Sequence, residues 1–300
     1  MRQRATRMPD TPTFSTLQVN RDLLVTHLRT LEGERHPISS RRAFDAAQSY
    51  VVEYFTHLGL SVTLDEFSFG GTGFANVVGQ TKGAPPGPRM LVGAHFDSTI
   101  GTPGADDNAS GVAAMLEAAR LVCEHAPWAS VEFVGFTLEE YGMVGSQHFA
   151  ARLKRKATPL LGMLSLEMVG FTESQGLQHY PALLRPFFPP TGNFLGLVGN
   201  LRSWNFLSMV TAAMRGVREL PIQGIVLPMN GRIVPESRLS DHSAFWDAGY
   251  PALLVTDTAS LRNPHYHKPT DTVSTLDLRF LELVTLAVTH AILAVAIPKH

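Results

Sequence analysis

The sequence predicts an α/β protein: a three-layer α/β/α sandwich around a mainly parallel, mixed central sheet. Short apolar runs alternate with segments of helical period from residue 89 onward, the pattern of strands joined by crossover helices. Residues 89–94 (RMLVGA) form a short, mostly apolar run, as expected for a strand covered on both faces. With 300 residues, 44% of them hydrophobic, the chain is long enough for one large core. We therefore predict a single domain over residues 1–300.

The N-terminal segment reads MRQRATRMPDTPTF and has positive charges but no apolar run after them, so it does not match a signal peptide. We expect residues 1–20 to form a flexible tail. Helical periods follow at 20–33 and 40–59, the second with Ser39 or Ser40 as N-cap and Gly59 at its end. Residues 60–68 and 74–80 are predicted strands.

From residue 89 the predicted elements alternate. The strands are 89–94, 130–137, 160–166 and 251–256, and the helices are 111–123, 142–153, 204–216, 241–248 and 276–296. Residues 175–200 are rich in proline, glycine and aromatics without a clear period, and we treat 175–235 as an insertion-like segment near the substrate site. The apolar run Leu281–Ile297 contains Glu282 and His290 and falls short of the about 20 apolar residues of a membrane span, so we predict a buried or amphipathic terminal helix.

Composition excludes several classes of function. The formal net charge is −1, which lends no support to a nucleic-acid partner. Cys123 is the single cysteine, so no intrachain disulfide can form, and we expect it to be a core residue. We expect a cytoplasmic protein without a membrane partner. The sequence does not indicate an oligomeric state.

Carboxylates and imidazoles follow the predicted strands where each one ends. They are His95 and Asp97, Asp106 and Asp107, Glu139 and Glu140, Glu167, and His265 and His267. The carboxyl ends of strands in such a sheet face one crevice, and these are ligand types that zinc prefers. Glu167 directly follows an apolar strand, where an unpaired carboxylate is costly. Ser98 and Ser110 lack the spacing of a hydrolase nucleophile, so a water is the expected nucleophile.

Five motifs occur in order: GAHFDST (93–99), GADDNASG (104–111), TLEEYGMVGS (137–146), SLEMVG (165–170) and YHKPTDT (266–272). They resemble the motifs of the M28 family of metallopeptidases. SDHSAFWDAGYPAL (240–253) resembles the segment that precedes the last ligand in that family. The first 60 residues and the stretch 175–235 carry little of the resemblance.

The resemblance implies the zinc-dependent exopeptidase fold and an aminopeptidase with two Zn²⁺ per chain. The implied ligands are His95, Asp107, Glu140, Glu167 and His267. Asp107 would bridge both ions and precede a cis peptide bond. Glu139 would be the general base that takes a proton from a metal-bridging water. Asp97 would accept the other ring N–H of His95 and fix its tautomer.

Several assignments stay open. The family usually has aspartate at the position of Glu167, so we expect the zinc site that holds Glu167 to be lost or exchanged more readily. Asp106 is an alternative to Asp107 as the bridging ligand. Asp271 and Thr272 are expected to anchor the loop that carries His267. The roles of His242, His265 and Asp257 are not defined by the sequence.

The leading function is removal of N-terminal residues from a peptide or small amide with a free N-terminus. There are three alternatives: glutaminyl cyclisation, a different zinc amidohydrolase activity on the same fold, or a non-catalytic binding module. Residues 178–206 are expected either to form a pocket wall or lid, or to pack on the surface or against a second copy. Their aromatic residues are Tyr180, Phe187, Phe188, Phe194 and Trp204.

Overall fold

A computed structural model describes residues 17–175, 178–181, 185 and 188–297. Its sheet has the strand order β1-β2-β4-β3-β5-β8-β6-β7. The strands are β1 (Ser61–Phe69), β2 (Thr72–Gln80), β3 (Arg89–His95), β4 (Val131–Phe136), β5 (Leu160–Glu167), β6 (Leu195–Asn200), β7 (Ile222–Leu227) and β8 (Ala252–Thr256). The central strands β4, β3, β5 and β8 run parallel, whereas β1, β2 and β6 form antiparallel pairs. The predicted α/β fold with a mixed sheet is confirmed.

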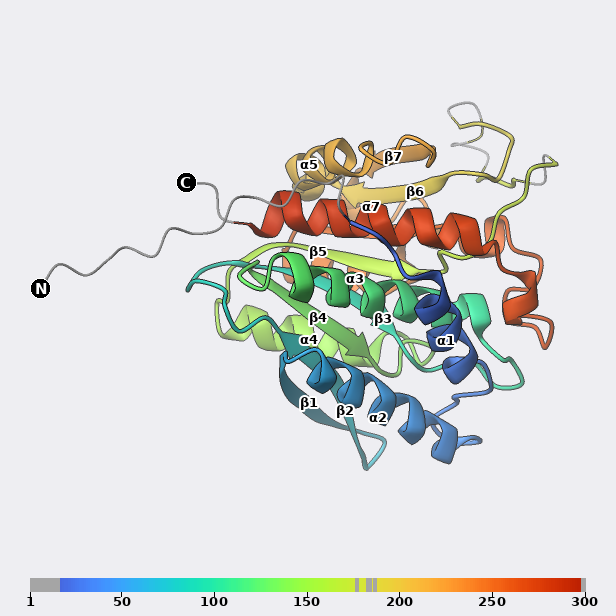
Figure 1. The fold of residues 1–300 in the computed structure, drawn as a ribbon. Helices are drawn as coiled ribbons and strands as arrows, with labels where there is room; N and C mark the ends of the chain where they lie inside the picture. Colours follow the sequence, from blue (N-terminus) through green and yellow to red (C-terminus); the bar gives the residue numbers. More distant parts are fainter. Residues whose placement is uncertain (1–16, 176–177, 182–184, 186–187, 298–300) are drawn as a thin grey trace, which may run out of the picture.

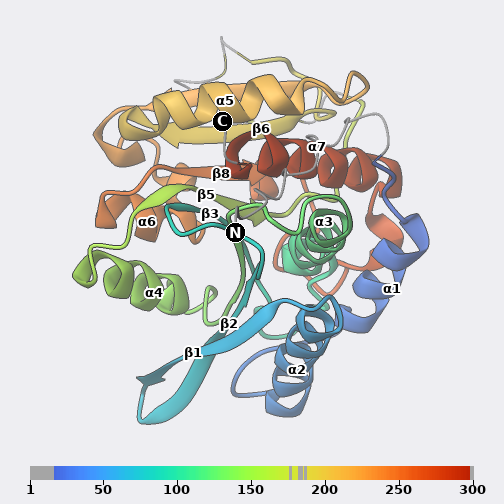
Figure 2. The ribbon, with the colours of Figure 1, turned by 60° about the vertical axis from the view of Figure 1, so that its left-hand side comes forward.

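Helices cover both faces of the sheet (Figures 1 and 2). One layer contains α1 (Arg21–Leu31), α2 (Arg41–His57), α3 (Gly111–His125), α5 (Trp204–Met214) and α7 (Leu278–Ala296). The other contains α4 (Val144–Arg155) and α6 (His242–Ala248). Each layer buries its own apolar cluster against the sheet, and this burial is the main term that stabilises the sandwich.

Helix α7 is a core helix. Among the described helices it is the one long and apolar enough to cross a membrane, yet 61% of its apolar window is buried. It packs between α3 and α5, and Val284, Val288 and Ile292 have no exposed surface. The prediction of a buried terminal helix is confirmed. Cys123, near the end of α3, is partly buried against the same core.

Strands β6 and β7 were not predicted from the sequence. Both are short, and β6 contains Gly196 and Gly199 while β7 contains Gly224, which weakens the apolar signal of a strand. Their pairing with each other and with β8 is a long-range contact that no local pattern reveals. The flexible tail predicted for residues 1–20 is wrong for residues 17–20. Leu17 is buried, and Asn20 caps α1. Residues 1–16 of that prediction lie outside the described residues.

Candidate metal centre

Five predicted ligands meet where the parallel strands end. His95 is the last residue of β3 and Glu167 the last residue of β5. Glu140 follows β4, His267 follows β8, and Asp107 lies in the turn before α3. The strand ends thus bring together side chains from segments that are far apart in the sequence.

The side chains form two groups that share Asp107. His95, Asp107 and Glu167 make one, and Asp107, Glu140 and His267 make the other. Asp107 Oδ1 lies 3.3 Å from His95 Nε2, while its other oxygen, Oδ2, lies 3.1 Å from His267 Nε2. The first group closes with Glu167 Oε2 at 3.4 Å from His95 Nε2, and the second with Glu140 Oε2 at 3.3 Å from His267 Nε2.

This donor set fits divalent cations. Burial, with Asp107 nearby, raises the pKa of Glu140 to about 7, and its Oε1 is buried without a hydrogen-bond partner. Burial also lowers the pKa of His267, but its bonds to Asp107 and Glu140 outweigh this and raise it to about 10. The positive charge of His267 therefore offsets part of the negative charge of Asp107 and Glu140. A metal ion would supply that positive charge and satisfy the orphaned oxygen.

Asp97 contacts the His95 ring through both its main chain and its carboxylate. The nearest acceptor to His95 Nδ1 is the main-chain carbonyl oxygen of Asp97 at 3.2 Å, whereas its carboxylate oxygen Oδ1 lies at 3.7 Å. That carboxylate also accepts from the main-chain N–H groups of Glu139 and Glu140, at 3.3 Å and 3.2 Å. Asp97 thus joins the His95 ring to the loop after β4.

The adjacent aspartates are separated by their contacts. The carboxylate of Asp106 turns away from the donor groups and accepts from Gly170 N–H at 2.9 Å and Asn263 Nδ2 at 2.6 Å. Asp107 alone of the two belongs to the donor groups. The Asp107–Asn108 peptide bond is cis, as the resemblance implied. The Asp271 carboxylate holds this turn by accepting from the N–H groups of Asp106 and Asp107, at 2.9 Å and 3.1 Å.

Glu139 lies beside the donor groups without belonging to them. Its Oε2 is 3.9 Å from His95 Nε2. Burial and the nearby carboxylates Glu167 and Asp241 raise its pKa, and the attraction of His95 opposes this rise. A second carboxylate, Glu167, is held by Ser240 Oγ, which donates to Glu167 Oε2 at 2.8 Å. Ser240 is a positioning contact that the sequence analysis did not identify.

The residues whose roles the sequence did not define, His242, His265 and Asp257, make contacts outside the donor groups. His242 is fully buried, with Nε2 at 2.8 Å from the Ser237 carbonyl oxygen and its ring edge on Trp246, and burial lowers its pKa to about 3. His265 Nδ1 lies 2.9 Å from Thr270 Oγ1. Asp257 accepts from the N–H groups of Phe171 and Ala259. Thr272 Oγ1 lies 2.8 Å from Ser274 Oγ. Asp271, its neighbour, is the residue that accepts from the N–H groups of Asp106 and Asp107.

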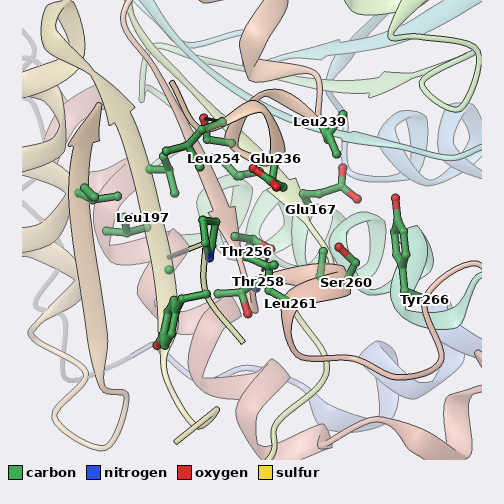
Figure 3. A pocket seen from close by; sticks show the side chains of 18 of the residues that line it. Glu167, Leu197, Glu236, Leu239, Leu254, Thr256, Thr258, Ser260, Leu261 and Tyr266 are labelled. Atoms are coloured by element: carbon green, nitrogen blue, oxygen red, sulfur yellow. Dashed lines mark hydrogen bonds between the residues drawn. The ribbon is translucent and has the colours of Figure 1, made fainter. Parts of the chain in front are cut away.

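A cavity of about 310 Å³ opens beside the donor groups. Its floor is the face of β8, β6 and β7 that carries Leu254, Val198 and Ile225, which lie side by side in the sheet register. Figure 3 shows Glu167 and Tyr266 on one side of the cavity and Leu197 on the other. The cavity therefore extends from the metal centre across an apolar surface.

The segment 178–206 forms part of the cavity wall. Tyr180, Phe188 and Phe194 line it. Trp204 does not, because it lies at the start of α5 with 63% of its surface exposed. Phe187 lies outside the described residues. Tyr266, which the sequence analysis did not treat as a site residue, also lines the cavity, and its ring stacks on His267 with centroids 3.8 Å apart.

Comparison with known proteins places these features in a family context. The sequence profile of peptidase family M28 matches residues 76–292. "Uncharacterized protein YfbL" of Escherichia coli (strain K12) is 33% identical over 287 residues, covering 90% of this chain and 85% of that protein. A "Probable zinc metalloprotease" of Pyrenophora teres f. teres (strain 0-1) is 30% identical over 200 residues, covering 57% of this chain and 43% of that protein.

Solved structures share the fold. The LapA aminopeptidase of Legionella pneumophila superposes with a TM-score of 0.73 at 18% identity, covering 94% of this chain and 72% of that one. The glutaminyl cyclase of Macrostomum lignano superposes with a TM-score of 0.68 at 21% identity, covering 95% of each chain. The same fold thus occurs in an aminopeptidase and in a glutaminyl cyclase, so the fold does not distinguish these two activities.

Proposed function

Since the chain belongs to peptidase family M28, we propose that it is a two-zinc aminopeptidase that removes N-terminal residues from peptides. The observation that carries this proposal is the sharing of Asp107 between two donor groups, with one oxygen directed to each. A single-metal centre would need only one such group. A carboxylate that serves two groups is the arrangement expected for two neighbouring cations.

The chain's own residues suit hydrolysis of an amide. The bound metal ions would polarise the scissile carbonyl and lower the pKa of the attacking water. Glu139, buried beside the donor groups, would take the proton of that water and deliver it to the leaving amine. The carboxylates of Glu139 and Glu167 both line the cavity and would pair with a free α-ammonium group, which would restrict the enzyme to chain ends.

The cavity supports a preference for large apolar N-terminal residues. Leu254, Val198 and Ile225 form its floor, and its described lining residues include Glu236 but no lysine or arginine. Burying a leucine side chain contributes about 1.5–3 kcal/mol, so we expect leucine amides to exceed alanine amides in kcat/KM by about 10- to 100-fold. Amides of aspartate and glutamate should be the poorest substrates.

A matched pair of variants tests this pocket. Ile225 faces the cavity, whereas the next residue of β7, Val226, packs on the core side. Ile225→Ala should reduce the leucine-over-alanine ratio by about threefold to tenfold. Val226→Ala should lower the melting temperature and leave that ratio unchanged. Equal effects of both variants on the ratio would place the selectivity elsewhere.

The function itself is tested by zinc content together with a substrate panel. We expect two zinc ions per chain, hydrolysis of leucyl-peptides, and loss of hydrolysis after N-acetylation of the same peptides. A peptide with N-terminal glutamine distinguishes the alternative, because cyclisation releases ammonia and leaves the rest of the peptide intact. One zinc ion with ammonia release would replace the proposal by glutaminyl cyclisation, and no bound zinc would exclude both.

A further inference from the structure

Arg35 lies between α1 and α2 and carries a charge into the interior. Only 3% of its surface is exposed, and its side-chain hydrogen bonds go to main-chain carbonyl oxygens rather than to carboxylates. Burial lowers the pKa of Arg35 to about 10, with Asp97 and Asp107 opposing the fall, so the guanidinium is charged at neutral pH. Burying a charge is costly, and the loops that it joins indicate its role.

The guanidinium joins the two segments that carry His95 and Asp107. Nε donates at 2.8 Å to the carbonyl oxygen of Phe96, the residue between His95 and Asp97. On the other segment, Nη1 donates to Pro103 O and Nη2 to Gly104 O, both at 2.9 Å. These carbonyls immediately precede the turn that contains Asp107.

The same side chain ties both segments to the end of α1. Nη1 also donates to the carbonyl oxygens of Leu31 and of Gly33, the latter at 2.7 Å. The main-chain N–H of Arg35 donates to Ser98 Oγ at 2.9 Å. All three nitrogens of the guanidinium are therefore used, and only a planar fork with five N–H groups can reach so many directions at once.

The fit at Gly104 shows how close this contact is. Gly104 has a φ of +62°, and a Cβ there would lie 2.5 Å from the Asp107 carbonyl oxygen and 2.8 Å from Arg35 Nη2. A side chain at this position would push Arg35 and the Asp107 turn apart. The glycine therefore lets the guanidinium rest directly on the backbone of the ligand turn.

We propose that Arg35 is a positioning residue for the metal centre, which holds the segments of His95 and Asp107 at the spacing that zinc binding requires. The inference rests on the proposed two-zinc function. Lysine keeps the charge but offers donors from a single nitrogen. Arg35→Lys therefore separates the geometry of the fork from its charge.

The test is zinc affinity of the full chain, stripped with a chelator and titrated with Zn²⁺ against a chromophoric competitor. We expect Arg35→Lys to weaken zinc binding by about 10- to 100-fold, the cost of losing an outer partner of a metal ligand. Ser98→Ala removes the acceptor of the Arg35 main-chain N–H and leaves the guanidinium contacts in place, so it should cause a smaller loss. Arg120→Lys is the matched control, because Arg120 also forms a fork, to Glu117, but on α3 away from the ligand segments. It should lower the melting temperature of the stripped protein without changing zinc affinity.

Wild-type zinc affinity in folded Arg35→Lys would overturn the inference. An equal loss in Arg120→Lys would also overturn it, because general destabilisation would then explain both. If Arg35→Lys does not fold, Gly104→Ala decides, because its Cβ would lie 2.8 Å from Arg35 Nη2 and would displace the guanidinium. Wild-type zinc affinity in that variant would reject the role of Arg35. Absence of zinc binding in the wild type would instead reject the proposed function.

Discussion

Replacing Glu139 by glutamine should reduce kcat by about 10²- to 10⁴-fold, the usual contribution of a positioned general base. Glutamine keeps the size of the side chain and its hydrogen-bonding oxygen but cannot accept a proton. The carboxylate of Glu139 stands apart from the donor groups, at 3.9 Å from His95 Nε2. Zinc content should therefore stay at the wild-type value. KM should also rise, by less than kcat falls, because one of the two carboxylates proposed to pair with the α-ammonium group loses its charge while Glu167 remains.

The matched control for this prediction is Glu132→Gln. Glu132 lies near the start of β4, the strand that leads to Glu139, and pairs with Arg89 at 3.7 Å. Its replacement should leave kcat within about twofold of the wild type, because this largely buried residue lies at the opposite end of β4 from Glu139 and pairs with Arg89 rather than with the donor groups. Loss of zinc from Glu139→Gln would indicate that Glu139 is a metal ligand. Full activity of Glu139→Gln would rule out Glu139 as the general base.

The sequence predicted the elements that carry the chemistry because those elements are locally coded. Strands 89–94 and 160–166 are mostly apolar runs, and each is followed at once by a polar ligand type, His95 or Glu167. The rule that strand ends converge then brought these residues to one edge. The two donor groups that share Asp107 agree with this reasoning. The role of their residues as zinc ligands stays a prediction.

Other parts of the site were not predicted because their signals are non-local. Arg35 sits in a loop without a motif, and its importance comes from carbonyls of segments about 60 to 70 residues later. Ser240 matters only because β5 ends next to it. The cavity floor is formed in part by β6 and β7, and the glycines in these strands weaken the apolar pattern by which a strand is predicted. Asp97 lies beside His95, but the additional contacts of its carboxylate with the N–H groups of Glu139 and Glu140 could not be predicted from a two-residue spacing.

The second large effect is expected from Asp107→Asn. One carboxamide cannot present a negative oxygen to both groups, because its nitrogen would face either His95 or His267, which lie 3.3 Å and 3.1 Å from the present oxygens. We expect zinc affinity at both sites to fall by more than the about 10- to 100-fold cost of losing an outer partner. Hydrolysis should become undetectable at zinc concentrations that saturate the wild type.

Asp106→Asn is the control that isolates the bridging role, since it changes the neighbouring carboxylate in the same buried turn. Asp106 contacts Gly170 and Asn263 rather than the donor groups, so this variant should lose stability but retain two zinc ions. Zinc content by metal analysis, with the melting temperature of each stripped protein, separates the two outcomes. Two zinc ions in Asp107→Asn would refute the shared ligand. Parallel zinc loss in both variants would assign the effect to the shape of the turn, because only Asp107 reaches both imidazoles.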